Sequence, residues 1–443
     1  MKIKLPAYIN TVIDTLEANG YEAYAVGGCV RDILMGRTPH DFDVCTSALP
    51  SEIKSCFDGE KVIPTGEKHG TVTLIGKEPV EITTFRTDGD YTDGRHPDSV
   101  TFIRNIEGDL ARRDFTVNAM AYSEKRGLID LYGGAEDLKN GVIRCVGEPE
   151  ARFQEDALRI LRALRFASVY GFSIEDETSA SIHLCRELLR KVSAERINSE
   201  ITKLLCGKDA AKIIRAYSDV IAVFIPEILP AIGFEQYSIH HHLDVWEHTL
   251  AVLDASENTP LMRWAALLHD IGKPVCFTTD DLGRRHFKGH PAVGEKLARD
   301  ILKRLKNDNR TVDTVCDVIK HHDDYFTGGR VEMRKYISRL GKDTADLVLR
   351  FRVFDTQGQA PDTREQKFAD LKRARELYDS VISDGDCTSV SDLAVNGSDL
   401  ISEGIPEGIE IKNALAFLLD AVMSDKCGND KDELISYLKG DNN

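Results

Sequence analysis

The stretch VGGCVRDILMGRTPHDFDV holds residue types that suit chemistry on nucleoside triphosphates. Gly27 and Gly28 follow an alternating apolar run, and adjacent glycines let a phosphate approach backbone N–H groups without a Cβ clash. Arg31, one helical turn further on, can donate to a phosphate oxygen. Asp41 and Asp43 are two apart, so on a strand their carboxylates share one face and suit Mg²⁺. Together these features predict nucleotidyl transfer assisted by two metal ions.

A second pattern suits the recognition of a base. RFQEDALRILRALRF is predicted as one amphipathic helix, on which Asp156 and Arg159, three apart, are neighbours. Aspartate accepts two hydrogen bonds and arginine donates through a rigid fork, so the pair complements the amine and ring-nitrogen edge that cytosine and adenine share. It mismatches uracil and guanine, so a protein surface would select C and A without a template. Arg162 and Arg165 continue the basic series and would stack on a base or hold phosphates.

Histidine and aspartate recur along the later part of the chain on successive predicted helices. Imidazole and carboxylate together suit a one- or two-metal site that activates water for hydrolysis. The six candidate positions are His248, His269, Asp270, His290, Asp355 and one of the adjacent His321 and His322.

Composition limits the classes of protein that the chain can belong to. Its 443 residues predict two to four domains. The net charge of −16 argues against a protein that coats nucleic acid non-specifically but leaves room for a local basic groove. None of the ten cysteines forms a C-x-x-C pair, a usage that fits reduced cytoplasm and not a disulfide or thiolate-zinc framework. No run approaches the roughly 18 apolar residues of a membrane span.

Two kinds of element must position these side chains. YEAYAV, HDFDVCT and the hairpin-like VTLIGKEPVEITTFR are predicted strands, and CVRDILMG is a short helix between the first two. From Pro149 onward the periodicity is helical. The expected fold class is therefore α+β, with a small mixed β-sheet head followed by an all-α neck, a domain that carries the histidines, and a tail. The expected boundaries are 1–146, 147–235, 236–358 and 359–443.

The motifs of the head resemble, as a set, those of a known family. GGCVRD, DFD, TGEKHGTVTL, EITTFRTDGDYTDGRHPD, RRDFTVNAMAY and EDALRILRALRFA resemble the class II tRNA nucleotidyltransferases, the CCA-adding enzymes, of the polymerase-β-like superfamily. The resemblance implies nucleotide contacts at Gly28, Arg31 and Arg113, Mg²⁺ ligands at Asp41 and Asp43 with Glu81 as a third carboxylate, and base reading by Asp156 and Arg159 beside Arg162 and Arg165. The resemblance also implies that the loop of residues 88–98 favours complete CCA addition, because members that add only CC tend to lack this loop.

The order H…HD…H…H…D resembles the HD phosphohydrolase superfamily. All six positions are filled, which implies a metal-dependent phosphatase or cyclic phosphodiesterase that uses Mn²⁺, Ni²⁺, Co²⁺ or Fe. We prefer His322 to His321 because it directly precedes an acidic residue, as in the usual form of that superfamily. The alternative is a vestigial site kept as a packing module. The tail resembles the segment with which class II enzymes would grip the tRNA elbow.

The resemblance implies that CTP and ATP are joined to the 3′ end of tRNA, without a template and with release of pyrophosphate. The expected partners are tRNA, CTP and ATP, with no membrane and no DNA, and the expected compartment is the cytoplasm. One alternative is a poly(A) polymerase, which shares the head motifs but would ignore CTP. Another is an HD phosphohydrolase with a nucleotide-sensing head. Such a head would be expected to lose a metal aspartate, yet Asp41 and Asp43 are both present.

Overall fold

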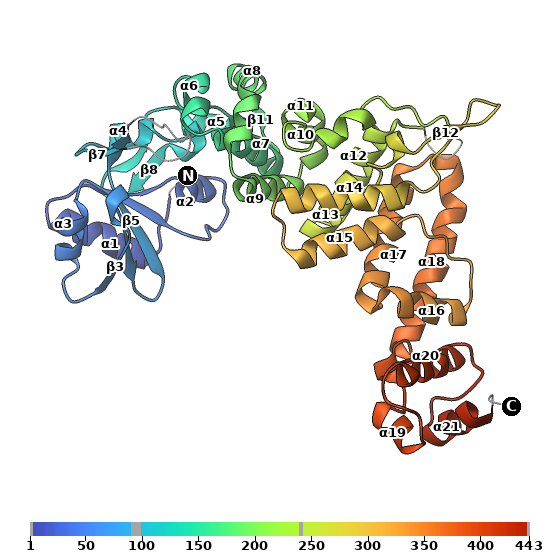
Figure 1. Ribbon diagram of the computed structural model, residues 1–443. Helices are drawn as coiled ribbons and strands as arrows, with labels where there is room; N and C mark the ends of the chain where they lie inside the picture. Colours follow the sequence, from blue (N-terminus) through green and yellow to red (C-terminus); the bar gives the residue numbers. More distant parts are fainter. Residues whose placement is uncertain (1–2, 90–98, 239–241, 441–443) are drawn as a thin grey trace. The chain divides into compact units, whose positions relative to one another are not determined.

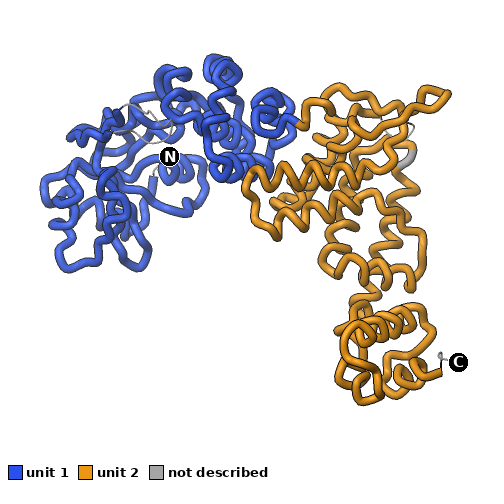
Figure 2. Tube along the Cα trace, viewed as in Figure 1, with its two compact units in different colours: residues 1–226 blue, residues 227–443 orange. Residues whose placement is uncertain are grey.

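The computed structural model describes residues 3–89, 99–238 and 242–440 (Figure 1). It divides into two compact units, residues 1–226 and 227–443 (Figure 2). The first unit begins with a mixed sheet, and the second is almost wholly helical, so the expected fold class is confirmed. No helix in the described part of the chain is long and apolar enough to cross a membrane. The finer division into four parts stays a prediction.

A seven-stranded sheet in the order β3-β4-β5-β2-β1-β8-β9 forms the head (Figure 1). Its strands are β1 (Ala23–Val26), β2 (Asp43–Thr46), β3 (Lys61–Gly66), β4 (Thr71–Ile75), β5 (Pro79–Thr84), β8 (Met120–Ser123) and β9 (Gly127–Asp130). A separate pair is β6 (Arg86–Asp88) with β7 (Val100–Phe102). The helices of the head are α1 (Ala7–Ala18), α2 (Gly28–Leu34), α3 (Pro50–Cys56), α4 (Ile106–Ala111) and α5 (Gly134–Asn140).

The inner strand β1 is buried on both faces, between two hydrophobic cores of the head. Side chains alternate along a strand, so Ala23 and Ala25 enter a core with α1, α2 and α3, while Tyr24 and Val26 enter the opposite core with α4. Burial on both faces explains why the run is apolar throughout. The core therefore holds the end of β1, where the glycine pair begins.

Strand pairing brings the glycine pair and the acidic residues to one edge of the sheet. β1 pairs antiparallel with β2, so Val26, the last residue of β1, lies opposite Asp43, the first residue of β2. β2 pairs in parallel with β5, and Asp43 lies beside Glu81. Because an antiparallel partner starts where its neighbour ends, Gly27 follows β1 at the same edge.

The rest of the first unit is helical apart from one short parallel pair. The strands of that pair are β10 (Val142–Ile143) and β11 (Ser173–Ile174). The helices are α6 (Pro149–Glu155), α7 (Leu158–Tyr170), α8 (Asp176–Cys185), α9 (Ala194–Leu205), α10 (Ala210–Ala216) and α11 (Ser218–Ile221). α7 packs along α9, and the apolar side chains of both are buried. This packing fixes the helix that carries the basic series.

The second unit is a helical array with one short hairpin, β12 (Thr278–Thr279) and β13 (Arg285–His286). Its helices are α12 (Val245–Ala255), α13 (Pro260–Leu268), α14 (His290–Arg304), α15 (Asn309–His321), α16 (Arg330–Leu340), α17 (Lys342–Gly358), α18 (Pro361–Ser383), α19 (Gly397–Ser402), α20 (Ile409–Met423) and α21 (Lys431–Gly440). Short 3₁₀ helices lie in the first unit at Glu67–His69, Thr116–Asn118 and Arg186–Lys191, and from Pro226 onward at Pro226–Ala231, Lys273–Val275 and Val390–Asp392. α12, α13, α15 and α17 pack against one another, so the histidines that they carry or precede converge.

Candidate active sites

The glycine turn in the head lies directly against an arginine. Gly27 has φ 76°, in the left-handed region, and its N–H donates to the carbonyl of Met120. A Cβ at this position would lie 2.9 Å from Nη1 of Arg113. Gly28 opens α2, where a Cβ would lie 3.5 Å from Nη2 of Arg31. The turn therefore presents bare backbone between two guanidinium groups, an arrangement suited to phosphate.

Three carboxylates gather at the same edge of the sheet. β2 begins at Asp43, and Asp41 precedes the strand instead of lying within it. Asp43 is an exposed residue at the start of the strand. Burial by the surrounding protein, with the charges of Asp41 and Glu81, nevertheless raises its pKa to about 6, against the opposing effect of Arg113. Acidic groups that repel one another in this way suit a divalent cation with oxygen ligands.

A chain of hydrogen bonds runs from α2 to α7 through the RRD motif. Arg31 donates from Nη1 to Oδ1 of Asn118 at 2.6 Å, and Asn118 donates from Nδ2 to Oδ1 of Asp114 at 3.0 Å. Nε of Arg162 donates to the other oxygen of Asp114 at 2.8 Å. Burial alone would raise the pKa of Asp114, but Arg162 and Asn118 outweigh it and lower the pKa to about 2. Two predicted nucleotide contacts are thus held by one buried carboxylate.

The ring of Phe166 gathers three of the predicted arginines. The guanidinium carbons of Arg31, Arg162 and Arg165 lie 5.3, 5.5 and 4.1 Å from its centroid. Nε of Arg165 also lies 2.7 Å from a carboxylate oxygen of Glu200, which is buried. All three arginines are therefore also paired with protein groups: Arg165 with Glu200, Arg162 with Asp114, and Arg31 with Asp32, to which its Nε donates at 2.9 Å.

The predicted single helix over RFQEDALRILRALRF is wrong, because the helix breaks at Asp156. This residue has φ −139° and ψ 103°, an extended conformation between α6 and α7. Its Oδ1 accepts a hydrogen bond from the backbone N–H of Leu158 at 3.0 Å. The side chain therefore satisfies one of the free N–H groups at the start of α7, which an uninterrupted helix would not need.

Asp156 and Arg159 are both largely enclosed, but they do not pair with each other. Oδ2 of Asp156 accepts from Arg196 at 2.7 Å. Nη1 of Arg159 donates to Glu155 at 2.6 Å, and its Nη2 donates to the carbonyl of Arg112 at 3.1 Å. Arg159 therefore lies beside the RRD motif, and each member of the predicted base-reading pair is bound to another protein group.

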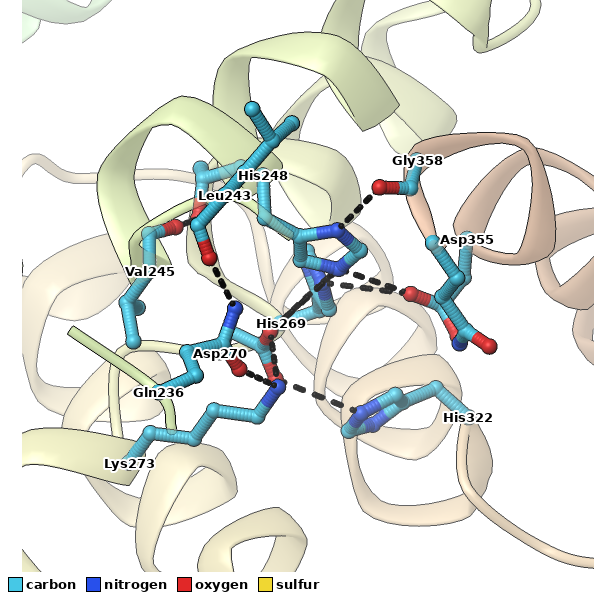
Figure 3. Close-up of polar contacts among 12 residues, drawn as sticks. Gln236, Leu243, Val245, His248, His269, Asp270, Lys273, His322, Asp355 and Gly358 are labelled. Carbon is cyan, nitrogen blue, oxygen red and sulfur yellow. Dashed lines mark hydrogen bonds and ion pairs between the residues drawn. The ribbon is translucent and has the colours of Figure 1, made fainter. Parts of the chain in front are cut away.

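Four histidines in the second unit point one nitrogen toward a common centre. Figure 3 shows three of them, His248, His269 and His322. The Nδ1 atoms of His248, His269, His290 and His322 lie 2.6–3.1 Å from the carbonyls of Gly358, Ala266, Phe287 and Ile319. A carbonyl only accepts, so each Nδ1 carries a proton, and in the neutral ring Nε2 then keeps its lone pair. This is the tautomer in which imidazole binds a metal through Nε2.

Asp270 lies between two sets of these nitrogens. Its Oδ2 is 3.2 Å from Nε2 of His269 and 3.4 Å from that of His248, while its Oδ1 is 3.3 Å from His290 and 3.7 Å from His322. The ligand atoms of each set lie within 4.8 Å of one another. The carboxylate is buried, and neither oxygen receives a well-directed hydrogen bond. Apart from the ammonium of Lys273 at 2.7 Å from Oδ2, both oxygens face histidine nitrogens, and such a carboxylate would suit divalent ions held by the two sets.

Two further groups complete this cluster. Asp355 places Oδ1 2.9 Å from Nε2 of His248, and the pKa of this buried carboxyl is lowered by His248 and the neighbouring histidines against the effect of burial. Lys273 places Nζ 2.7 Å from Oδ2 of Asp270. His321 lies outside the cluster and pairs with Asp324 at 3.0 Å. The structure thus brings together all six predicted residues of this site.

Other groups at these sites were not singled out from the sequence. Asp114 stands within the quoted RRD motif, and Glu155 directly precedes Asp156, so adjacency was an available signal. Arg196 and Glu200 lie on a different helix, and no local pattern marks them. The loop 88–98 lies, from residue 90 onward, outside the described residues.

Family models match three successive parts of the chain. The Poly A polymerase head domain matches residues 23–144, the probable RNA and SrmB-binding site of polymerase A matches residues 171–231, and the HD domain matches residues 238–370. Together with the carboxylate edge and the histidine cluster, they define a nucleotidyltransferase with a head of the polymerase type and an HD domain.

Relatives that match along the whole chain narrow this class. The CCA-adding enzyme of Lactobacillus delbrueckii subsp. bulgaricus is 35% identical over 96% of both chains, and that of Geobacillus stearothermophilus is 34% identical over 96% of this chain and 95% of its own. The chain therefore belongs to the CCA-adding enzymes, the tRNA nucleotidyltransferases. The family predicted from the motifs is confirmed, and the poly(A) polymerase alternative is not supported.

Solved structures agree with this assignment. The Bacillus stearothermophilus CCA-adding enzyme in complex with CTP has a TM-score of 0.71 and 31% identity, covering 98% of this chain and 96% of its own. The Thermotoga maritima CCA-adding enzyme complexed with tRNA has a TM-score of 0.59 over 100% of this chain and 97% of its own. At 22% identity, the second likeness concerns the fold alone.

Proposed function

We propose that this chain completes the 3′ end of tRNA in the cytoplasm by adding C, C and A from CTP and ATP. The main support is the convergence of the glycine turn, two arginines and three carboxylates at one edge of the head sheet. The 3′-hydroxyl would attack the α-phosphate, and the bond to the leaving pyrophosphate would break. No DNA or membrane partner is expected. The division into head (1–146), neck (147–235), HD domain (236–358) and tail (359–443) belongs to this proposal.

The roles of the head residues follow from their positions. Asp41 and Asp43, with Glu81 beside them, would hold Mg²⁺, which when bound neutralises charge on the triphosphate. Gly27 and Gly28 leave room for the phosphates near the backbone. Arg31, Arg113 and Arg162 would contact the nucleotide, and the Asp114 network keeps the first and last of these guanidinium groups in place.

Base selection would proceed by exchange of partners. Asp156 and Arg159 are already bound to Arg196 and Glu155, so an incoming base must offer a matching donor and acceptor to replace these charged contacts. Cytosine and adenine present an amine beside a ring nitrogen and can do so. Uracil and guanine would place a carbonyl opposite the acceptor Asp156 and a ring N–H opposite the donor Arg159. Both side chains would then be left as unpaired buried polar groups. Arg165 would support this surface through Glu200.

The test uses tRNA that lacks its terminus, with Mg²⁺ and each nucleotide supplied singly and together, followed by sequencing of the 3′ ends. Wild-type protein is expected to produce CCA with CTP and ATP and no extended homopolymer. Asp41→Ala and Asp43→Ala are expected to abolish addition. Asp270→Ala, which removes a carboxylate in the other unit, should preserve it. Addition by Asp43→Ala at the wild-type rate would refute the assignment of the head site.

For the second unit we propose a metal-dependent phosphohydrolase. The support is the position of buried Asp270 between two pairs of histidines, with the ligand atoms of each set within 4.8 Å of one another. Imidazole with carboxylate suits Mn²⁺, Ni²⁺, Co²⁺ or Fe, and these ions when bound lower the pKa of water. The test measures phosphate release from p-nitrophenyl phosphate and from nucleoside 2′,3′-cyclic phosphates with each metal. Release by Asp270→Ala at the wild-type rate would refute this site.

A further inference from the structure

A cavity of about 440 Å³ opens over the histidine cluster. Its walls include four of the six cluster residues, Asp270, His290, His322 and Asp355, and four cationic side chains, Lys273, Arg285, Lys288 and Lys367. A second cavity of about 110 Å³ shares with it the group His322, Asp323, Asp355, Gln359 and Lys367. The ammonium-bearing side chain of Lys367 therefore stands where the two cavities meet, beside the cluster.

Lys367 is held at this junction by a short relay from a cluster residue. Gln359 donates from Nε2 to Oδ2 of Asp355 at 2.8 Å, and its Oε1 accepts from Nζ of Lys367 at 2.5 Å. The backbone carbonyl of Gln359 accepts from Nε of Arg364 at 2.6 Å, which ties the turn after α17 to the start of α18. Because Asp355 can only accept and Lys367 can only donate, the orientation of the Gln359 amide is fixed.

The charge of Lys367 is not matched by a direct carboxylate partner. Lys273, on the other side of the cluster, lies 2.7 Å from Asp270. Within the described residues, the hydrogen-bond partner of Lys367 is instead the neutral amide of Gln359. Lys367 is half-buried, and burial lowers its pKa, with the more distant carboxylates of Asp355 and Asp323 opposing this effect. A partly desolvated ammonium group on a neutral partner is costly unless an anion joins it.

We propose that Lys367 contacts the phosphoryl group of the substrate in the HD site. This inference rests on the proposed phosphohydrolase function. It assigns a substrate-binding role to α18, a helix that carries none of the six histidine and aspartate residues of the cluster. In hydrolysis, water adds to phosphorus, the bond from phosphorus to the ester oxygen breaks, and the alcohol leaves with a proton. Lys367 remains protonated throughout and balances negative charge on a phosphoryl oxygen. The substrate class is a phosphate ester whose phosphoryl group fits between the histidine cluster and Lys367.

The experiment compares Lys367→Met, Lys367→Arg and the matched control Lys288→Met, whose side chain lines the same cavity but is exposed. Three quantities are measured in the full chain loaded with Mn²⁺: the Kd for inorganic phosphate by calorimetry, kcat/KM for p-nitrophenyl phosphate, and bound manganese. For Lys367→Met we expect both phosphate affinity and kcat/KM to fall by about ten- to a hundredfold, the range of a charged hydrogen bond. Manganese content should match wild type. Lys367→Arg should recover part of the loss, and Lys288→Met should change either quantity by less than about threefold.

Each outcome has a defined meaning. Unchanged phosphate affinity in Lys367→Met would overturn the assignment, and so would loss of manganese, because Lys367 would then only support Asp355 through Gln359. If the wild type binds phosphate but hydrolyses no ester, the phosphohydrolase proposal fails while the binding data still decide the role of Lys367. If manganese-loaded wild type does not bind phosphate, both proposals fail.

Discussion

The Nε2 atoms of His290 and His322 lie 3.2 Å apart, and the Nδ1 atom of each ring lies on a backbone carbonyl. In neutral rings that donate from Nδ1, neither Nε2 carries a proton, so two lone pairs face each other. Oδ1 of Asp270, a third acceptor, is 3.3 Å from His290. Three acceptors gathered without a donor are unfavourable in protein alone and favourable around a divalent cation.

We therefore predict that the HD site binds two divalent transition-metal ions and that single substitutions change the number of ions bound per chain. His322→Ala should retain one ion, because His248, His269 and Asp270 remain as a complete set. Asp270→Asn should lose both ions, because its carboxylate serves both sets. The measurement is bound manganese per chain by mass spectrometry after dialysis. His321→Ala is the matched control and should keep two ions, since His321 pairs with Asp324 outside the cluster. Equal losses in both histidine variants would contradict this arrangement.

Gly358 is predicted to be essential for the first metal set. Its carbonyl accepts from Nδ1 of His248 at 3.1 Å, and a Cβ here would lie 2.8 Å from that atom and 2.9 Å from a methyl group of Val252. Because Gly358→Ala must displace the His248 ring, we expect metal affinity to fall about ten- to a hundredfold, as it does when an outer partner of a ligand is lost. Competition with a fluorescent chelator measures this. Gly440→Ala, where nothing lies within 4 Å, should have wild-type affinity.

Local spacing was enough to predict some of these groups and could not reveal others. The separation of Asp41 from Asp43 and the adjacency of His269 and Asp270 are short-range patterns that the chemistry itself requires. Lys367 and Arg196 reach their sites through helix packing, which no spacing in the sequence records. The break at Asp156 was missed because apolar periodicity continues across it while a side-chain cap ends the helix.

Asp114 is predicted to be the main electrostatic anchor of the neck. Asp114→Asn would leave the guanidinium of Arg162 without its carboxylate, and we expect a loss of about 2 kcal/mol in the free energy of unfolding, reduced from the fully buried case because Arg162 is partly exposed. A folded pKa of about 2 lies below the ordinary value, so this stabilisation is complete above about pH 4 and is lost only as the pH falls toward 2.

The loss should therefore be constant between pH 6 and 9, measured by thermal melting. Arg162→Met should cost a similar amount, and the double variant Asp114→Asn/Arg162→Met should cost less than the sum, because both single changes break the same contact. Additive losses would show that the two residues act independently. We also expect both single variants to weaken discrimination between CTP and UTP in single-nucleotide addition.

Asp43 should show the opposite relation between charge and stability. Burial and the charges of Asp41 and Glu81 raise its folded pKa to about 6, above the ordinary value. Between about pH 4 and pH 6 the folded state thus holds a proton that the unfolded state has released, so the contribution of Asp43 to stability decreases as the pH rises through this window. In metal-free protein above pH 6 the ionised carboxylate is destabilising. Asp43→Asn removes that charge, and we expect it to raise the free energy of unfolding by about 1 kcal/mol, a value discounted for partial exposure.

The measurement is the difference in melting temperature between Asp43→Asn and wild type in chelator. This difference should be near zero at pH 4, grow toward pH 6 and level off above it. Asp58→Asn, an exposed change in the same unit, should give no comparable trend. Adding Mg²⁺ should reduce the advantage of the variant, because only the wild type gains a ligand from the carboxylate. If Asp43→Asn were less stable than wild type at pH 8 without metal, the Asp43 carboxylate would be stabilised by its protein contacts. The prediction that its charge destabilises the metal-free protein would then be wrong.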